Sequence, residues 1–261
     1  MGKIEEKFHD LRIKGKKAFI VYVPFGFPNI SLSRDIILTL QESGVDLVEL
    51  GLPFSDPLAD GSILQEANQI ALQAKATTDK LFPFLQELKE DITVPLILMS
   101  YYNPLYRWGL KNFLRRVKYL GIDGVMVVDL PLEESSDYIS IARNLDLDTI
   151  FFITPTTSLA RKKKIMECSR GFVYYISVTG TTGPKNLSLQ SIRREISSLR
   201  KINQLAICVG FGIHSVSQAR EIREISDGII LGSVIVEFIK ENFKNRDFLK
   251  SLNFLVRRFC V

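Results

Sequence analysis

The sequence offers little sulfur or imidazole chemistry. Its three cysteines, Cys168, Cys208 and Cys260, are far apart, odd in number and never in a C-x-x-C pair. That pattern favours neither a disulfide framework nor a zinc site. The two histidines, His9 and His214, form no ligand cluster and no triad with a serine. We therefore expect no metal centre.

Long uncharged apolar runs are also missing. No stretch approaches the ~18 residues of a membrane-spanning helix, and the opening MGKIEEKFHDLRIKGKK lacks the apolar core of a secretory signal. We therefore expect a soluble, cytoplasmic protein. With 46% apolar and 24% charged residues, the composition is that of an ordinary globular chain. The net charge of +5 comes from basic runs without interleaved aromatic residues, which favours solvated helix faces over a nucleic-acid surface.

Short apolar runs recur along the chain, each followed by a segment with helical spacing. They are rich in Val, Ile, Phe and Tyr and too short for helices, so they predict strands. The runs cover residues 17–25, 45–51, 94–102, 123–130, 147–154, 171–178, 204–210 and 227–233. Eight β–α units with nearly continuous apolar strands predict an α/β fold, the closed (β/α)8 TIM barrel. No G-x-G-x-x-G follows the first run, which argues against an open dinucleotide-binding sheet.

Three further features complete the predicted architecture. A helix around residues 2–12 precedes the first strand, and we expect it to plug the barrel bottom. No linker or change in composition divides the chain, so residues 1–261 are predicted to form one domain. Ser31 and Ser158 stand where helix N-caps are expected, and Gly44 and Gly121 stand where helices are expected to stop.

The active site of such a barrel lies at the carboxyl ends of its strands, which draws attention to Glu49. Alternation along VDLVELG places Leu47 and Glu49 on the barrel-facing side of the second strand. An unpaired carboxylate there is unfavourable unless it is neutralised or functional, and burial would raise its pKa toward the range of proton transfer. The plainer alternative is a rim glutamate paired with Lys or Arg.

Two more carboxylates follow in the segment ELGLPFSDPLADG. A loop through Pro53 and Pro57 could turn Asp60 back to the same mouth, but Asp60 before Gly61 could equally cap the next helix. The spacing leaves these two interpretations open. Asp56, which precedes Pro57, fits a turn residue.

Glycines after the last two strands indicate a phosphate site. Gly210 and Gly212 follow the seventh strand, and Gly232 with Ser233 opens a helix after the eighth. Phosphates in these barrels bind between those loops, on backbone N–H groups at a helix N-terminus. The loop SVTGTTGPKN at 177–186, after the sixth strand, is long and polar, which is typical of a mobile lid.

Aromatic residues gather at the predicted strand ends, where a flat aromatic substrate could stack. They are Tyr22, Tyr101, Tyr102, Tyr174, Tyr175 and Phe211. Together with the carboxylates and the phosphate loops, they predict a cofactor-free barrel enzyme that acts on an aromatic phosphate ester by acid–base chemistry.

With these motifs in place, the sequence resembles the tryptophan synthase α subunit family over nearly its whole length. The segment VELGLPFSDPLADG (48–61) is similar to the signature stretch of that family. The motifs SYYNP (100–104), DLPLEES (129–135), TGTTG (179–183), GFGIHS (210–215) and GSVIV (232–236) follow in the same order and spacing. The resemblance implies tryptophan biosynthesis, by retro-aldol cleavage of indole-3-glycerol phosphate to indole and glyceraldehyde 3-phosphate.

The resemblance also implies roles for individual residues. Glu49 is the main acid and base, Asp60 accepts the indole N–H, and Tyr174 assists near the bond that breaks. The implied indole pocket is lined by Tyr22, Tyr101 and Phe211. The implied phosphate and lid residues are Gly183, Gly212, Gly232, Ser233 and Thr182, the last of which closes onto Asp60.

Finally, the resemblance implies a partner. The α chain carries no cofactor, and pyridoxal phosphate lies on a β subunit that receives the indole within an α2β2 complex. The residues implied to face that subunit are Asp56, Pro57, Tyr102, Asn103, Pro104, Asp129 and Pro131. Val178 stands in the lid where the family commonly has Arg, and the 23–28 loop also differs from the common pattern. An alternative hypothesis is therefore a catalytically weak α-like subunit that acts mainly as an allosteric activator of its β partner.

Overall fold

The predicted strands form one parallel sheet that curls into a barrel. The computed structural model describes residues 2–177, 188–210 and 212–260. Its strands are β1 (Ala18–Pro24), β2 (Leu47–Gly51), β3 (Leu96–Ser100), β4 (Gly124–Val127), β5 (Asp148–Thr149), β6 (Phe152–Ile153), β7 (Phe172–Ile176), β8 (Ala206–Gly210) and β9 (Gly228–Leu231). They are hydrogen-bonded in the order β5-β4-β3-β2-β1-β9-β8-β7-β6, and all neighbouring pairs are parallel.

The fifth predicted strand, residues 147–154, consists of two short strands rather than one. Its first half, β5, pairs with β4, whereas its second half, β6, pairs with β7. Between the two halves, the backbone N–H of Ile150 still donates to the carbonyl of Val125 at 3.3 Å. One chain segment therefore bridges both ends of the strand order and closes the ring, as a (β/α)8 barrel requires.

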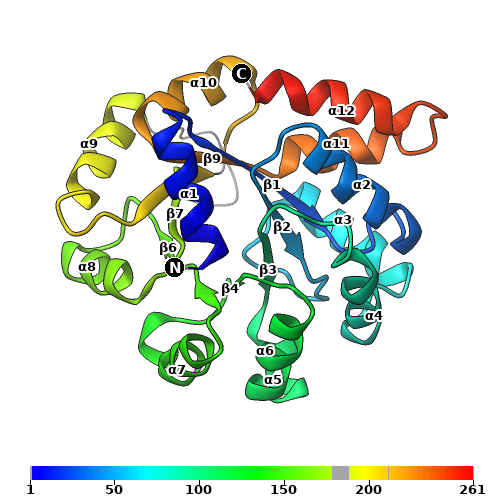
Figure 1. Cartoon of the computed structure of the whole chain (residues 1–261), viewed down its shortest axis with the longest axis horizontal. Helices are drawn as coiled ribbons and strands as arrows, with labels where there is room; N and C mark the ends of the chain where they lie inside the picture. The colour runs from blue at the N-terminus through cyan, green and yellow to red at the C-terminus, as the bar shows by residue number, and fades with distance from the viewer. Residues whose placement is uncertain (1, 178–187, 211, 261) are drawn as a thin grey trace.

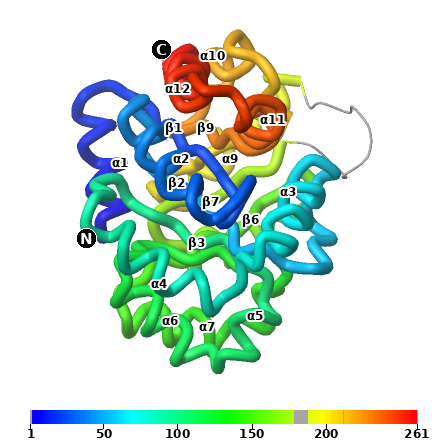
Figure 2. Tube along the Cα trace, turned by 90° about the vertical axis from the view of Figure 1, so that its right-hand side faces the viewer, coloured from blue at the N-terminus to red at the C-terminus, as the bar shows by residue number. Residues whose placement is uncertain are grey.

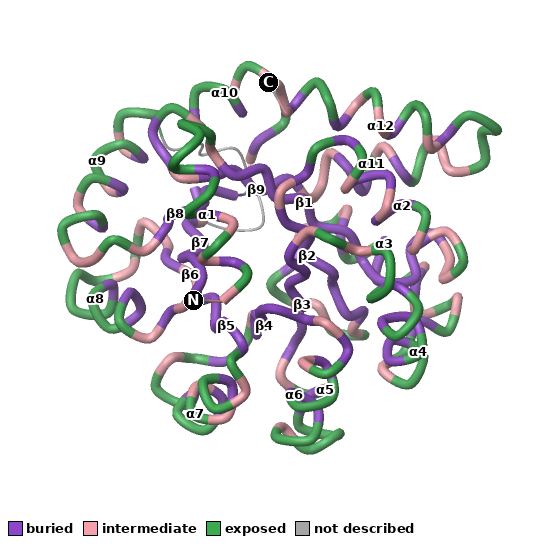
Figure 3. Tube along the Cα trace, viewed as in Figure 1, coloured by how far each residue is buried: buried purple, intermediate pink, exposed green. Residues whose placement is uncertain are grey.

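Helices surround the barrel (Figure 1). They are α1 (Lys3–Ile13), α2 (Ile30–Glu42), α3 (Ser62–Gln73), α4 (Thr78–Leu88), α5 (Tyr102–Trp108), α6 (Leu110–Tyr119), the 3-10 turn η1 (Leu132–Glu134), α7 (Ser136–Asn144), α8 (Leu159–Cys168), α9 (Leu189–Leu199), α10 (Val216–Ile225), α11 (Ser233–Asn242) and α12 (Phe248–Phe259). The strands are buried almost throughout, and the exposed residues lie on the outer faces of the helices (Figure 3). Of the helices described, none is long and apolar enough to cross a membrane.

Local signals begin and end the helices largely as predicted. Ser158 is the N-cap of α8, and its side chain accepts a hydrogen bond from a backbone N–H at 3.4 Å. Gly44 and Gly121, with φ angles of +94° and +92°, follow the last turns of α2 and α6. The expected cap of α2 is wrong. Asn29 rather than Ser31 holds that position, because its Oδ1 reaches the backbone N–H three residues on at 3.0 Å.

Helix α1 plugs the amino-terminal end of the barrel, as predicted. Its Ile4, Phe8 and Leu11 are buried in the same apolar cluster as the inward-facing strand residues. The rings of Phe8 and Phe172 pack with centroids 5.7 Å apart. In both views α1 lies against the strand bundle, at its edge in Figure 2. The carboxyl ends of the strands are at the other end of the barrel from this plug.

Candidate active site

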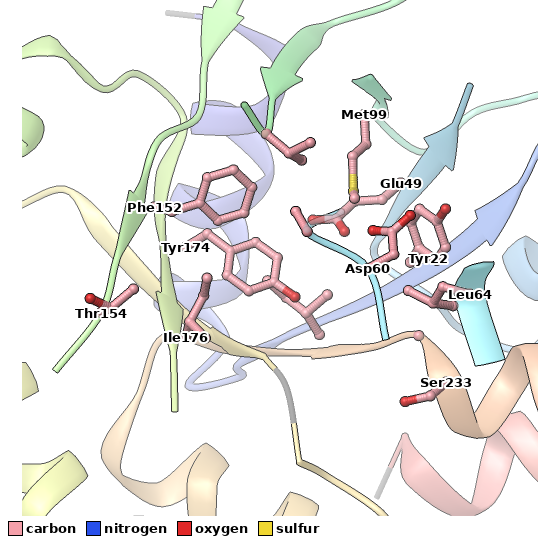
Figure 4. Close-up of a pocket in the computed structure, with 14 residues that line it drawn as sticks. Tyr22, Glu49, Asp60, Leu64, Met99, Phe152, Thr154, Tyr174, Ile176 and Ser233 are labelled. Atoms are coloured by element: carbon pink, nitrogen blue, oxygen red, sulfur yellow. The ribbon is translucent and has the colours of Figure 1, made fainter. Parts of the chain in front are cut away.

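Inward-facing side chains from several strands meet at the carboxyl end of the barrel. Tyr22 of β1 and Glu49 of β2 are register partners, so their side chains stand next to each other in the interior. Tyr174 of β7 reaches the same space from the facing wall, and Asp60 enters from the loop after β2 (Figure 4). The residues predicted to be catalytic therefore line one cavity.

This cavity has a volume of about 280 Å³ and a mainly apolar wall. Its lining residues are Tyr22, Glu49, Ala59, Asp60, Leu64, Met99, Val128, Phe152, Thr154, Tyr174, Ile176, Ile230, Gly232 and Ser233. A few polar groups converge within an apolar enclosure, which is the composition expected of a site for a small organic ligand.

Glu49 is buried, with an exposed fraction of 1%. Its Oε1 has no hydrogen-bond partner, and no Lys or Arg pairs with it, among the residues that the structure describes. Within the described residues, Glu49 is therefore not a rim glutamate paired with Lys or Arg. Burial raises the pKa of Glu49 to about 8, because a carboxylate is poorly solvated there. The side chain thus holds a proton at neutral pH.

Asp60 is held by the helix that follows it. Its Oδ2 accepts a hydrogen bond from Nδ2 of Asn68 at 2.9 Å, and Gln65 of the same helix donates to its carbonyl at 2.9 Å. Burial raises the pKa of Asp60 to about 6, while hydrogen bonds from Asn68 and Tyr101 act in the opposite direction. The N-cap of α3 is Gly61. Asp60 therefore lies at the barrel mouth, largely ionised at neutral pH, and does not cap the helix.

Two glycines make room for the tyrosines of the cavity. A Cβ atom at Gly51 would lie 2.3 Å from the hydroxyl oxygen of Tyr22, and a Cβ atom at Gly210 would lie 2.2 Å from that of Tyr174. Any other residue would displace these rings. The sequence pattern suggested a phosphate loop at Gly210, whereas its contact with Tyr174 gives it a packing role. Phe152 supports the same ring, with centroids 5.2 Å apart.

The predicted aromatic rim is present only in part, because Tyr101, Tyr102 and Tyr175 do not line the cavity. Tyr101 lies behind the loop that carries Asp60, where its hydroxyl accepts a hydrogen bond from a backbone N–H at 3.0 Å. Tyr102 begins the surface helix α5. Tyr175 packs in the outer core, between the sheet and the helices, because successive strand residues point to opposite faces.

The first turn of α11 forms a polar end of the cavity. Gly232 and Ser233 line it, and the N–H groups of Ser233 and Val234 have no acceptor among the described residues. Unpaired N–H groups and the helix dipole make this end suitable for an anion. Gly212, also predicted to hold phosphate, instead lines a separate cavity of about 110 Å³ against α9 and α10.

Some predicted residues lie outside the part of the chain that the structure describes. They are Val178, Thr182, Gly183 and Phe211. Within the described ranges, no group of His, Cys, Asp and Glu side chains is arranged to hold a metal ion.

The sequence pattern did not single out the apolar wall or Asn68. Met99 and Phe152 of that wall are inward-facing by the same alternation that identified Glu49, so strand period was an available signal for them. The signal for Asn68 is a polar residue in the buried stripe of α3, with Leu64 and Ala71 on either side.

The residues predicted to face a partner fall in three segments, 56–57, 102–104 and 129–131, which lie together at the surface. Phe54, just before the first segment, stacks on Tyr101, just before the second, with ring centroids 5.0 Å apart. The backbone N–H of Tyr102, in the second, donates to Oδ1 of Asp129, in the third, at 2.7 Å. Leu58, beside them, is 84% exposed. The residues predicted for this surface are exposed or half-buried: Asp56, Pro57, Tyr102, Asn103, Pro104, Asp129 and Pro131.

Comparison with known proteins points to one family. The model of the family described as "Tryptophan synthase alpha chain" matches residues 8–259 of this chain. The tryptophan synthase alpha chain of Petrotoga mobilis is 40% identical over 242 residues, which are 93% of this chain and 92% of that protein. That of Carboxydothermus hydrogenoformans is 39% identical over 246 residues, which are 94% and 92% of the two chains.

Solved structures agree. Tryptophan synthase subunit alpha from Legionella pneumophila superposes with a TM-score of 0.92 at 29% identity, covering 100% of this chain and 97% of that one. An aminoacrylate-bound tryptophan synthase from M. tuberculosis gives a TM-score of 0.89 at 27% identity, covering 100% and 98%. Sequence, barrel topology and overall length thus lead to the same result, and the chain belongs to the tryptophan synthase alpha chain family.

Proposed function

We propose that this chain cleaves indole-3-glycerol phosphate at the barrel mouth, with Glu49 as its acid and base and Asp60 as the partner of the indole N–H. One observation carries the assignment: two buried carboxylates of different acidity line one apolar cavity. Such a pair divides acid and base roles at a single pH, because the environments move the two pKa values apart.

The proposed reaction begins with the proton on Glu49. Glu49 donates it to C3 of the indole, which breaks the ring's aromaticity and places positive charge on N1. Asp60, ionised, accepts a hydrogen bond from N1–H and stabilises that charge. The Glu49 carboxylate then takes the proton of the glycerol hydroxyl next to the ring. The C3–C bond breaks, its electron pair returns to the indole, and glyceraldehyde 3-phosphate leaves with a new aldehyde. Glu49 ends protonated, as it began.

The rest of the cavity suits the rest of the substrate. The apolar wall and the rings of Tyr22, Phe152 and Tyr174 form an enclosure for the indole. The N-terminal turn of α11, at Gly232 and Ser233, offers N–H groups for the phosphate. We assign the lid contacts of Thr182 and Gly183 and the ring contact of Phe211 by family resemblance alone.

The step moves protons and one electron pair, so this chain's own residues supply all the chemistry that it needs. In this family the α chain has no cofactor, and pyridoxal phosphate is bound by the β subunit of the α2β2 complex. The exposed segment around Asp56, the start of α5 and the Asp129 turn are the surface that we assign to that β partner. A cytoplasmic location belongs to the same proposal, as for other enzymes of amino-acid biosynthesis.

The test is release of indole from indole-3-glycerol phosphate, with and without the cognate β subunit. The Glu49→Gln variant should lose about 10²- to 10⁴-fold in kcat, the usual contribution of a general acid and base, while it still binds a non-cleavable analogue. Glu87→Gln, an exposed change on α4, is the matched control and should keep full activity. Unchanged turnover in Glu49→Gln would reject the assignment. A wild-type complex that stimulates the β reaction but releases no indole would favour the catalytically weak subunit instead.

A further inference from the structure

Asn68 is a buried polar side chain next to Asp60 that takes no part in the proposed steps. Asn68 projects from the buried face of α3, which otherwise carries Leu64, Ala67 and Ala71. Its exposed fraction is 2%. An apolar residue would continue that stripe, so packing alone does not explain an asparagine there.

Within the described residues, the amide nitrogen of Asn68 is hydrogen-bonded and its amide oxygen is not. Its Nδ2 donates to Oδ2 of Asp60 at 2.9 Å, whereas its buried Oδ1 has no partner among the described residues. Burying an unpaired amide oxygen disfavours the folded state. The chain therefore keeps a destabilising polar group, and its one hydrogen bond within the described residues is to the carboxylate of Asp60.

The groups around Asp60 show what that contact changes. Tyr22 from β1, Tyr101 after β3 and Tyr174 from β7 interact electrostatically with it, and Tyr101 also hydrogen-bonds it. Glu49 from β2 lines the same cavity. None of them carries a positive charge. Burial favours the protonated acid, which accepts the indole N–H only weakly and cannot offset positive charge on N1. The N–H donors of the Asn68 amide favour the ionised form instead.

We propose that Asn68 is a positioning residue for the cleavage reaction: by donating to Oδ2, it keeps Asp60 ionised and directs Oδ1 to the indole N–H. This inference rests on the proposed function. It also explains why the loop can carry a catalytic carboxylate at all. Asp60 belongs to no strand or helix, and α3 supplies the fixed point through Asn68 for the side chain and Gln65 for the backbone.

The test is the pH dependence of indole release in Asn68→Leu, a change of similar size that completes the apolar stripe. Thermal stability should change little, since the substitution removes an unpaired oxygen and also a hydrogen-bond donor to Asp60. The acid limb of kcat/KM should move to higher pH. The ratio of kcat/KM at pH 5.5 to that at pH 7.5 should fall about 3- to 10-fold, as expected when a hydrogen bond to an ionised group is lost. The substrate phosphate also titrates near pH 6, but equally in both enzymes.

Two controls separate the possible outcomes. Gln65→Leu removes the hydrogen bond to the backbone of Asp60 and leaves the carboxylate alone, so its acid limb should match that of the wild type. In an Asp60→Asn background, Asn68→Leu should cause no further shift. An unshifted acid limb in Asn68→Leu, or a uniform loss of activity together with a lower melting temperature, overturns the positioning role. If the wild type releases no indole, the proposed function fails instead.

Discussion

At the scale of the residue, burial raises the pKa values of two carboxylates of one cavity to different levels. Glu49 has no hydrogen-bond partner for Oε1 among the described residues, and the pKa of its side chain rises to about 8. Asp60 is equally buried in its side chain but accepts a hydrogen bond from Asn68, and its pKa rises only to about 6. Desolvation is the main cause of both shifts, and hydrogen bonds from Asn68 and Tyr101 lower the pKa of Asp60 alone.

This separation predicts a bell-shaped pH profile. Below pH 6 Asp60 takes up a proton and loses the negative charge that we propose stabilises the positive indole ring, so kcat/KM should fall on the acid side. Above pH 8 Glu49 loses the proton that it donates to C3, so kcat/KM should fall on the basic side. Steady-state indole release between pH 5 and 9.5 measures both limbs. A rate that keeps rising to pH 9.5 would show that Glu49 acts from its ionised form and contradict the assignment.

At the scale of the element, strand alternation points the side chains of the site into the barrel, and glycines leave room for its tyrosine rings. Tyr22, Glu49 and Tyr174 are inward-facing residues of β1, β2 and β7, and alternation from the sequence correctly placed Glu49 inside. The aromatic pattern of the sequence places both Tyr174 and Tyr175 at the rim, which this rule forbids. Adjacent positions cannot both face inward, and Tyr175 packs outside the barrel.

Other features of the site depend on distances that no local pattern encodes. The 147–154 segment is divided between two strands, because it must pair with β4 at one end and β7 at the other. Gly210 is a glycine because a ring from the neighbouring strand lies against it. Side-chain reach in the folded chain likewise makes Asn29, and not Ser31, the cap of α2. It also brings Asn68 to Asp60.

The contact between Gly210 and Tyr174 yields a prediction at this scale. Gly210→Ala would place a methyl group 2.2 Å from the tyrosine hydroxyl, so the ring must move. Overpacking of this kind destabilises by about 1–3 kcal/mol, and the displaced ring should lower indole release as well. Urea unfolding and a cleavage assay report the two effects. Gly61→Ala is the steric control: its Cβ meets nothing within 4 Å, and loss of the glycine N-cap of α3 should cost less than about 1 kcal/mol. Equal stability in the two variants would mean that Tyr174 has room to move.

At the scale of the whole molecule, a helix closes one end of the barrel and the cavity lies at the other end. Helix α1 plugs the amino-terminal end with Ile4, Phe8 and Leu11, while the cavity lies among the carboxyl ends of the strands. The segment from Glu49 to Gly61 links that cavity to the surface. It starts at the buried acid, exposes Asp56 and Leu58, and returns to the cavity at Asp60. A partner that touches this loop therefore touches a segment with a buried cavity carboxylate at each end.

The Asp129 turn is the point at which this surface can be tested without altering the cavity wall. Asp129 accepts the first N–H of α5 and places a negative charge at the start of that helix. Asp129→Ala should loosen α5 and weaken β-subunit binding about 10-fold, the effect of losing one charge-assisted hydrogen bond. Isothermal titration with the β subunit measures the affinity, and indole release by the α chain alone should stay near the wild-type rate. Asp137→Ala, an exposed change on α7, is the control. If Asp129→Ala binds the β subunit as tightly as this control does, the partner does not depend on this surface.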